Sequence, residues 1–202
     1  MTPEEYYGDF FTRLKYGEEY LKNLIEKYPV NKTDDGIQPI LYVKSRIKTP
    51  QSTINKLEKR GFPTDKDTAL SKIYDTIGIR IVCSFEEEVY NISKWLYQRR
   101  EIHIIEEKDY IAYPKANGYR SLHLILQFTE RELKDLTAEI QIRSIAIDFW
   151  AVLEHQLKYK QDVPHEDIIK KELKRCADEI ASIDLSMQTI RELLRNDTWN
   201  GY

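Results

Sequence analysis

Apolar residues recur every three or four positions at both ends of the chain, which is the spacing of one face of an α-helix. At the N-terminal end, over residues 3–28, the apolar positions are Tyr7, Phe10, Leu14, Leu21, Leu24 and Tyr28. At the C-terminal end, over residues 165–195, they are Ile169, Leu173, Cys176, Ile180, Ile183, Met187, Ile190 and Leu194. We expect a long amphipathic helix in each place, packed on its own domain, forming the seam of an oligomer, or both.

The middle of the chain alternates apolar and polar residues in short runs, which is typical of half-buried strands. Strands are expected near residues 40–48, 77–83, 102–109, 121–128 and 137–143, and helices near 50–60, 86–99 and 145–160. The first of these helices has Thr49 as its cap and Pro50 at its first position. A short charged stretch joins the last two strands, so they are expected to form an antiparallel hairpin. The pattern predicts an α+β fold, a mixed or antiparallel sheet of about five strands flanked by helices.

A single domain over residues 1–202 is expected, because no internal repeat, low-complexity tract or linker-like run divides the chain. With 41% hydrophobic and 32% charged residues, the composition is that of an ordinary globular protein. The formal charge of −3 provides no global positive field for nucleic acid or anionic lipid. The N-terminus lacks a leader pattern, and no run reaches the roughly 18 apolar residues of a membrane span. Two cysteines form no disulfide or zinc pattern. We therefore expect a cytoplasmic protein with no membrane contact.

Phosphate binding in this chain has to rely on side chains and helix ends, because the seven glycines include no GxGxxG or P-loop spacing. Arg46 and Lys48 share one face of a strand, and Ser52 and Lys56 lie four positions apart on the following helix. Together with the free amides at the start of that helix, they could form a polyphosphate cradle. The alternative is a solvated basic strand followed by a capped helix.

Charged residues also accompany the apolar strand at 77–83. Asp75 precedes it, and Arg80 interrupts it on the side opposite to its apolar neighbours. A buried guanidinium needs a carboxylate, a phosphate or an aromatic ring as partner. Arg80 is therefore expected either to stack on a nucleobase or to pair with Asp75 or Glu139.

The predicted hairpin carries one chemically varied face. Glu139, Gln141 and Arg143 alternate with apolar residues, and His123 lies on one face of the preceding strand. Such a face is either wetted by solvent or part of a site. Asp75 and Glu139 could together hold Mg²⁺, which takes one or two carboxylates and completes its shell with waters and phosphates. The histidines show no zinc-ligand spacing.

A turn marked by Asn117 and Gly118 separates Lys115 from Tyr119 just before a strand. The tyrosine ring could stack on a base or be half-buried in the strand. On the helix at 145–160, Trp150 and Glu154 share one face, which by itself indicates packing.

Five motifs, taken in order, resemble the synthetase domain of the RelA/SpoT family. They are RIKxxxSxxxK from Arg46, DxxGxR from Asp75, KxxGYRSxH from Lys115, EIQIR from Glu139 and WxxxEH from Trp150. The resemblance covers about residues 40–160, and the chain is similar in length to the stand-alone small alarmone synthetases. It implies a nucleotidyltransferase-like fold that transfers the β,γ-pyrophosphate of ATP to the 3′-hydroxyl of GDP or GTP, producing AMP and ppGpp or pppGpp.

The resemblance also implies a role for each matching side chain. ATP would be bound by Arg46, Lys48, Ser52, Lys56, Arg80 and Glu154. The guanine nucleotide would be bound by Lys115, Tyr119, Arg120, His123 and Gln141. Asp75 and Glu139 would hold Mg²⁺, with Glu139 as the candidate general base. Members of the family are commonly homotetramers, which implies an oligomer here.

Two other functions stay open at the level of sequence. One keeps the same transfer but changes the acceptor to an adenine nucleotide or to the 3′ end of a tRNA. The other is a catalytically silent module that binds nucleotides or RNA, although both carboxylates of the predicted metal site are present and the net charge does not indicate a broad RNA surface.

Overall fold

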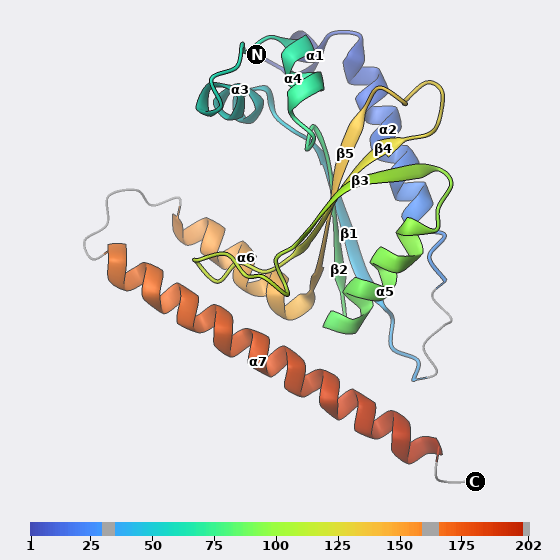
Figure 1. Cartoon of the computed structure of the whole chain (residues 1–202), viewed down its shortest axis with the longest axis vertical. Coiled ribbons are helices and arrows are strands. Elements are labelled where there is room, and N and C mark those ends of the chain that lie inside the picture. Colours follow the sequence, from blue (N-terminus) through green and yellow to red (C-terminus); the bar gives the residue numbers. More distant parts are fainter. Residues whose placement is uncertain (30–34, 159–165, 200–202) are drawn as a thin grey trace.

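The computed structural model describes residues 1–29, 35–158 and 166–199 and consists of one sheet with helices around it (Figure 1). The strands are β1 (Ile40–Ile47), β2 (Ile77–Cys83), β3 (Ile102–Asp109), β4 (Leu122–Phe128) and β5 (Thr137–Ser144). The helices are α1 (Pro3–Tyr7), α2 (Phe10–Ile25), α3 (Pro50–Lys59), α4 (Lys66–Lys72), α5 (Glu86–Tyr97), α6 (Ile145–Lys158) and α7 (Glu166–Trp199).

The sheet is mixed, with the strand order β1-β2-β5-β4-β3. Its two central strands, β2 and β5, are parallel, whereas β1 with β2, β4 with β5 and β3 with β4 are antiparallel. This confirms the expected α+β class, the five expected strands and the antiparallel hairpin of the last two. The hairpin matters for function because its register places His123 opposite Gln141.

One face of the sheet forms the hydrophobic core. Alternate residues such as Ile79 in β2, Leu124 in β4 and Ile140 in β5 are buried on this face against α2 and α5. Burying such a side chain completely contributes about 1.5–3 kcal/mol to folding. Helix α6 lies on the opposite side of the sheet from α2 and α5, and α7 runs along the end of the sheet from α6 toward α5 (Figure 1). The polar residues of the strands point toward that second side.

The expected single helix over residues 3–28 is wrong in detail, since α1 and α2 are separate helices. Gly8 ends α1 with a φ of 57°, a backbone conformation that glycine adopts readily, and α2 begins two residues later. Helix α4 was not expected, because its seven residues are too few to display an apolar period. Asp65 caps it by accepting a hydrogen bond from the Thr68 amide at 2.9 Å.

Helix α3 begins as the sequence indicates, with the Thr49 hydroxyl accepting from the Ser52 amide and Pro50 in the first turn. The helix expected at 145–160 is confirmed as α6 up to residue 158, and residues 159–160 lie outside the described ranges. In those ranges, none of the helices is both long and apolar enough to cross a membrane.

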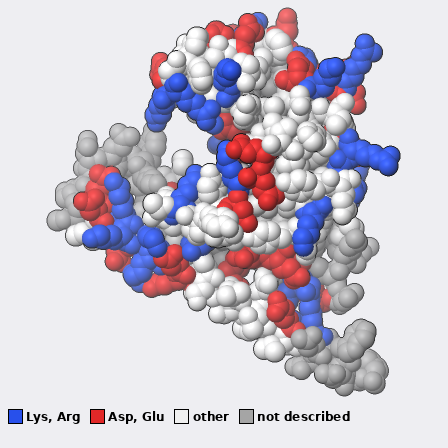
Figure 2. Space-filling view, in the orientation of Figure 1, with Lys and Arg blue, Asp and Glu red and all other residues white. Residues whose placement is uncertain are grey.

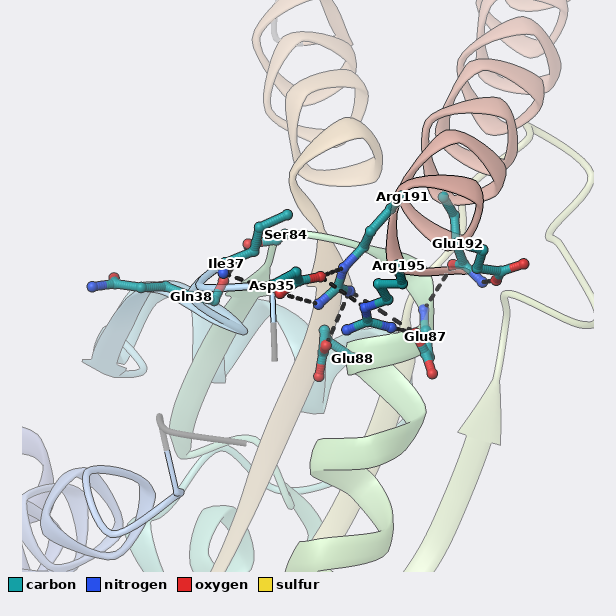
Figure 3. A network of polar contacts seen from close by, with 10 residues as sticks. Asp35, Ile37, Gln38, Ser84, Glu87, Glu88, Arg191, Glu192 and Arg195 are labelled. Atoms are coloured by element: carbon teal, nitrogen blue, oxygen red, sulfur yellow. Dashed lines mark hydrogen bonds and ion pairs between the residues drawn. The ribbon is translucent and has the colours of Figure 1, made fainter. Parts of the chain in front are cut away.

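The C-terminal helix α7 is anchored to the body at several points along its length. The Trp150 indole donates to the Leu173 carbonyl at 2.9 Å, and Ser144 donates to the buried carboxylate of Asp184. Farther along, Arg191 donates to Asp35 at 2.6 Å and to Glu88 at 3.1 Å (Figure 3).

The apolar stripe of α7 divides between the two expected roles. Leu173, Cys176 and Ile180 pack against a small cluster around Trp150, as expected for packing within one domain. Ile183 and Leu194, by contrast, are 60% and 64% exposed. The chain itself therefore covers the stripe from Leu173 to Ile180, and the C-terminal half of the stripe faces outward.

Candidate active site

The predicted site residues gather on the face of the sheet opposite the hydrophobic core. Register places Arg46 beside Gly78 across β1 and β2, and Gly78 beside Glu139 across β2 and β5. The same parallel register places Arg80 beside Gln141. Because directly paired residues point to the same side of a sheet, these side chains share one face. Residues separated by almost a hundred positions in the chain thus meet on three neighbouring strands.

The Asp75 carboxylate sits between two lysines at the start of β2. Lys48, after β1, and Lys56, on α3, each donate to it at 2.8 Å. Burial by itself would raise the pKa of Asp75, but the bonds and charges of both lysines outweigh this effect and lower it. Lys48 is largely buried in this pair, so the alternative of a simple solvated basic strand does not hold for it. One carboxylate facing two ammonium groups leaves a net positive charge.

Glu139 is held by two neighbours on the same face. Its Oε1 lies 2.9 Å from His123 Nδ1, and its Oε2 accepts from Gln141 Nε2 at 2.9 Å. Burial would raise the pKa of Glu139, as would the nearby Asp75 charge, but the bond and charge of His123 together with Gln141 lower it. Glu139 is therefore ionised at neutral pH, and its charge is close enough to that of Asp75 for the two to repel each other.

Tyr119 contacts His123, the neighbour of Glu139, and Arg143. Its hydroxyl lies 2.9 Å from His123 Nε2 and accepts from Arg143 Nη2 at 2.6 Å. The cationic ends of Lys115 and Arg143 lie 5.0 Å and 5.1 Å from the centre of its ring, within cation–π range. The ring is thus fixed by polar contacts at its tip and by cations beside its π surface.

Asp148 is a functional candidate that sequence reasoning missed. This α6 carboxylate is 2% exposed and accepts from Arg143 Nη1 at 3.0 Å and from Tyr42 at 2.8 Å. It also lies 3.5 Å from Arg80, so the carboxylate that pairs with Arg80 is Asp148, and the alternative that named Asp75 or Glu139 as its ion-pair partner is wrong. The signal that could have found it is the arginine in EIQIR, since a buried guanidinium requires a carboxylate partner.

Arg80 is only partly satisfied by Asp148. Its Nε is buried and makes no hydrogen bond within the described part of the chain. Burial, followed by the charge of Arg143, lowers the pKa of Arg80, which means that the cation lacks full compensation. Such a group favours an anion or an aromatic ring as an additional partner.

Three predicted residues lie at the edge of this arrangement. Ser52 is exposed at the first turn of α3, where its hydroxyl accepts from Thr49 at 2.9 Å. Glu154 on α6 is buried and accepts from Asn117 at 3.0 Å, so it contacts the 115–120 turn. Arg120 points to α7, where it donates to Asp178 at 3.0 Å.

The donor set of Asp75 and Glu139 fits a magnesium ion. Both are half-buried carboxylates with lowered pKa values, and their charges interact. Mg²⁺ binds one or two such carboxylates and keeps sites for water and substrate phosphates. Among the described residues no group of three or more His, Cys, Asp or Glu lies close enough together to hold a metal ion.

Residues 45–163 match the family model described as the region found in RelA / SpoT proteins. The chain belongs to the RelA/SpoT family. Within this family, the GTP pyrophosphokinase YwaC of Bacillus subtilis (strain 168) is 41% identical over 162 residues, which are 78% of this chain and 76% of that protein. The GTP pyrophosphokinase YjbM of the same organism is 31% identical over 161 residues, 78% of this chain and 75% of that protein.

Solved structures of RelA/SpoT relatives share the fold. The small alarmone synthetase 2 from Bacillus subtilis superposes with a TM-score of 0.77 at 36% identity, covering 92% of this chain and 98% of the other. The small alarmone synthetase 1 from Bacillus subtilis, bound to its product pppGpp, superposes with a TM-score of 0.78 at 27% identity, covering 95% and 97%. The likeness thus extends over more than nine tenths of this chain and of each solved chain.

Proposed function

We propose that this protein is a GTP pyrophosphokinase that transfers the β,γ-pyrophosphate of ATP to the 3′-hydroxyl of GDP or GTP. The products are AMP and ppGpp or pppGpp. The observation that carries the proposal is the meeting of Asp75, Glu139 and the cations Arg46, Lys48 and Lys56 on one side of the sheet. The relatives named GTP pyrophosphokinase, which match more than three quarters of this chain, support it.

The reaction breaks the bond between the β-phosphorus of ATP and the oxygen that bridges to the α-phosphorus. The 3′-oxygen of the acceptor forms the new bond to the β-phosphorus, and its proton passes to a base. Because the transferred group is already an electrophile, catalysis consists mainly of in-line positioning and neutralisation of negative charge. Lys48 and Lys56 would neutralise the phosphates, with Arg46 and Ser52 beside them at the junction of β1 and α3.

Adenine recognition is proposed for Arg46 and Arg80. They lie diagonally across β1 and β2 on the same face, since Arg46 pairs with Gly78 and Arg80 with Lys44. The buried Nε of Arg80 and its incomplete pairing support a planar partner such as a nucleobase. Glu154, which the resemblance assigns to the ATP side, contacts Asn117 of the 115–120 turn at 3.0 Å, so it would support the ATP side only indirectly, through α6.

The acceptor would lie over the β4–β5 hairpin. Tyr119 would stack on the guanine base. Lys115, His123 and Gln141 would orient the phosphates and ribose of the acceptor nucleotide. Glu139 is the candidate general base, held in place by His123 at 2.9 Å. A lowered pKa makes Glu139 a weak base, so its main contribution is orientation and charge, with proton transfer late in the reaction.

Asp75 and Glu139 would hold Mg²⁺, which supplies charge neutralisation for the transferred pyrophosphate when it is bound. Binding of this ion would give Asp75 a cationic partner in addition to Lys48 and Lys56, and the two lysines would then be available to phosphate oxygens.

An oligomer formed through α6 and α7 is also proposed. The outward half of the α7 stripe and the exposed Phe149 and Leu157 of α6 support it, because large apolar side chains gathered on neighbouring helices favour association. The face in Figure 2 interleaves acidic and basic side chains without a continuous basic stripe, which does not favour RNA as a partner. A cytoplasmic location stays a prediction of the sequence.

The test is a product assay with purified protein, ATP, Mg²⁺ and one acceptor at a time. GDP should yield ppGpp and GTP should yield pppGpp, and in each case one AMP should form for every molecule of the guanosine product. Anion-exchange chromatography separates these products. An adenine nucleotide and tRNA serve as competing acceptors. A folded protein that converts neither GDP nor GTP, or that prefers one of the competing acceptors, would overturn the proposal.

A further inference from the structure

The turn that carries Tyr119 packs on α7, a helix that follows the whole sheet in the sequence. Arg120 reaches across to this helix, where Nη2 donates to Asp178 Oδ1 at 3.0 Å and Nη1 lies 3.4 Å from the Ala177 carbonyl. The same Nη1 donates back to the Gly118 carbonyl at 3.1 Å. One guanidinium thus joins both sides of the contact between the turn and α7.

The backbone of the turn makes the contact tight. Gly118 has a φ of 87°, and a side chain at this position would place its Cβ 2.6 Å from Ala177 Cβ and 3.3 Å from Lys174 Cα. Glycine is therefore needed here both for its conformation and for its lack of a side chain. Ala177 is 3% exposed, which shows that the turn covers it.

Helix α6 completes the support from the other side. Asn117 donates to Glu154 at 3.0 Å, and the Tyr119 ring packs on the cluster formed by Trp150, Ala151 and Ala177. The orientation of Tyr119 is consequently set by α6 and α7, which follow it in the chain, together with His123 of β4 and Arg143 of β5, which contact its hydroxyl.

We propose that α7 positions the acceptor-binding turn, and that Arg120 acts through Asp178 and Ala177 as a positioning residue without binding the nucleotide itself. This inference rests on the proposed function only in assigning the turn to the acceptor. It differs from the resemblance, which implies direct nucleotide binding by Arg120. Placement of α7 then controls the affinity for the acceptor, while the ATP side at α3 is left unaffected.

A double-mutant cycle tests this role. Arg120→Ala and Asp178→Ala should each raise the KM for GDP roughly fivefold to tenfold, with kcat and the KM for ATP little changed. The double variant should be no worse than the worse single variant, because both changes break the same contact. Arg175→Ala, which removes an α7 arginine paired with Glu172 and Glu179, is the matched control and should change neither constant.

The conservative variant Arg120→Lys separates the two roles. A lysine retains the charge that would attract a phosphate, but it cannot join two carbonyls and a carboxylate as the planar guanidinium does. We expect it to behave like Arg120→Ala. Recovery of the wild-type KM by Arg120→Lys, or effects of the single changes that multiply in the double variant, would overturn the positioning role.

Hydrogen exchange without nucleotide provides a readout that does not depend on activity. Amides of residues 115–121 should exchange faster in Arg120→Ala and in Asp178→Ala than in the wild type, and at the wild-type rate in Arg175→Ala. Unchanged exchange in the first two variants would contradict the proposal even if the enzyme is active. Faster exchange in a protein that forms no product would support the anchoring and refute only the proposed function.

Discussion

Glu139 Oε1 and His123 Nδ1 lie 2.9 Å apart on adjacent antiparallel strands, and the other ring nitrogen of His123 lies 2.9 Å from the Tyr119 hydroxyl. The His123 imidazole therefore contacts both Glu139, the candidate general base, and Tyr119, the ring proposed to stack on guanine. Arg143 extends the series from Tyr119 to Asp148 on α6. The reacting end of the acceptor and its base would be oriented by the same chain of hydrogen bonds.

Replacing Glu139 by Gln should lower kcat by at least about 100-fold, because the variant keeps the shape of the side chain but loses its charge and its basicity. Amide groups can still bond His123 and Gln141, so the fold should be retained. The measurement is the rate of AMP release, with circular dichroism and urea unfolding as the control for folding. Activity within a few-fold of the wild type would contradict the assignment.

Tyr119→Ala should raise the KM for GDP or GTP with a smaller change in the KM for ATP, since base stacking on an aromatic ring contributes about 1–3 kcal/mol. Tyr119→Phe keeps the ring but loses the bonds to His123 and Arg143, so it should lower kcat more than it raises the KM. Steady-state kinetics with each substrate varied in turn distinguishes these effects. Equal behaviour of the two variants would show that the ring does not stack on the acceptor.

Removing the Asp148 carboxylate should destabilise the fold, because Asp148→Ala leaves Arg80 and the buried Arg143 without their shared anion. Breaking a buried ion pair on one side costs about 3–5 kcal/mol. Urea unfolding measures the loss. Asp135→Ala, at an exposed pair with Arg13, is the control and should cost at most about 1 kcal/mol. Similar losses in both variants would argue against the bridging role of Asp148.

Chelation with EDTA should stop turnover and added Mg²⁺ should restore it, with no change in circular dichroism. Asp75→Asn should require a higher Mg²⁺ concentration for half-maximal rate, because it removes one of the two proposed carboxylate ligands. A variant with the wild-type Mg²⁺ dependence would exclude Asp75 as a ligand. Turnover that persists in excess EDTA would exclude the metal altogether.

The Asp35–Arg191 contact should make the stability of the protein sensitive to acid. The Arg191 hydrogen bond lowers the pKa of Asp35 well below its ordinary value. A carboxyl group whose folded-state pKa is depressed stabilises the fold above its unfolded pKa of about 3.9, and this stabilisation is lost as pH falls toward the folded value. The difference in unfolding free energy between the wild type and Arg191→Met should therefore be largest near neutral pH and shrink below about pH 4.

Urea unfolding of both proteins from pH 3 to pH 7 checks this dependence. The matched control is Arg175→Met, which removes an exposed arginine from the same helix and should leave the stability unchanged at every pH. A constant difference between the wild type and Arg191→Met across the range would show that Asp35 does not titrate with this contact.

Local patterns were sufficient for most of the elements. Alternation identified all five strands, and the Thr49 cap with Pro50 located the start of α3. They were insufficient where one residue or a short segment decides the outcome. Gly8 ends α1, but the apolar residues on either side of it keep helical spacing, so the sequence predicted one continuous helix in place of α1 and α2. Helix α4 is too short to show an apolar period.

Local patterns likewise predicted one part of the candidate site and missed another. Strand alternation assigned Glu139, Gln141 and Arg143 to one face, and register confirms that His123 shares it. The ion-pair partners of Arg80 and Arg120 could not be predicted in this way. Arg80 pairs with Asp148, and Arg120 with Asp178, because α6 and α7 fold back toward the sheet, and no spacing along the chain encodes that approach.

The sequence by itself determined the five strands, most of the helices, the polar face of the hairpin and the family, because periodicity and motifs are properties of neighbouring residues. Only the tertiary structure decided which charges meet, since hydrogen bonds and ion pairs depend on distances of about 3 Å between atoms brought together by packing. Asp75 held by two lysines and Tyr119 resting on α7 are both results of that packing.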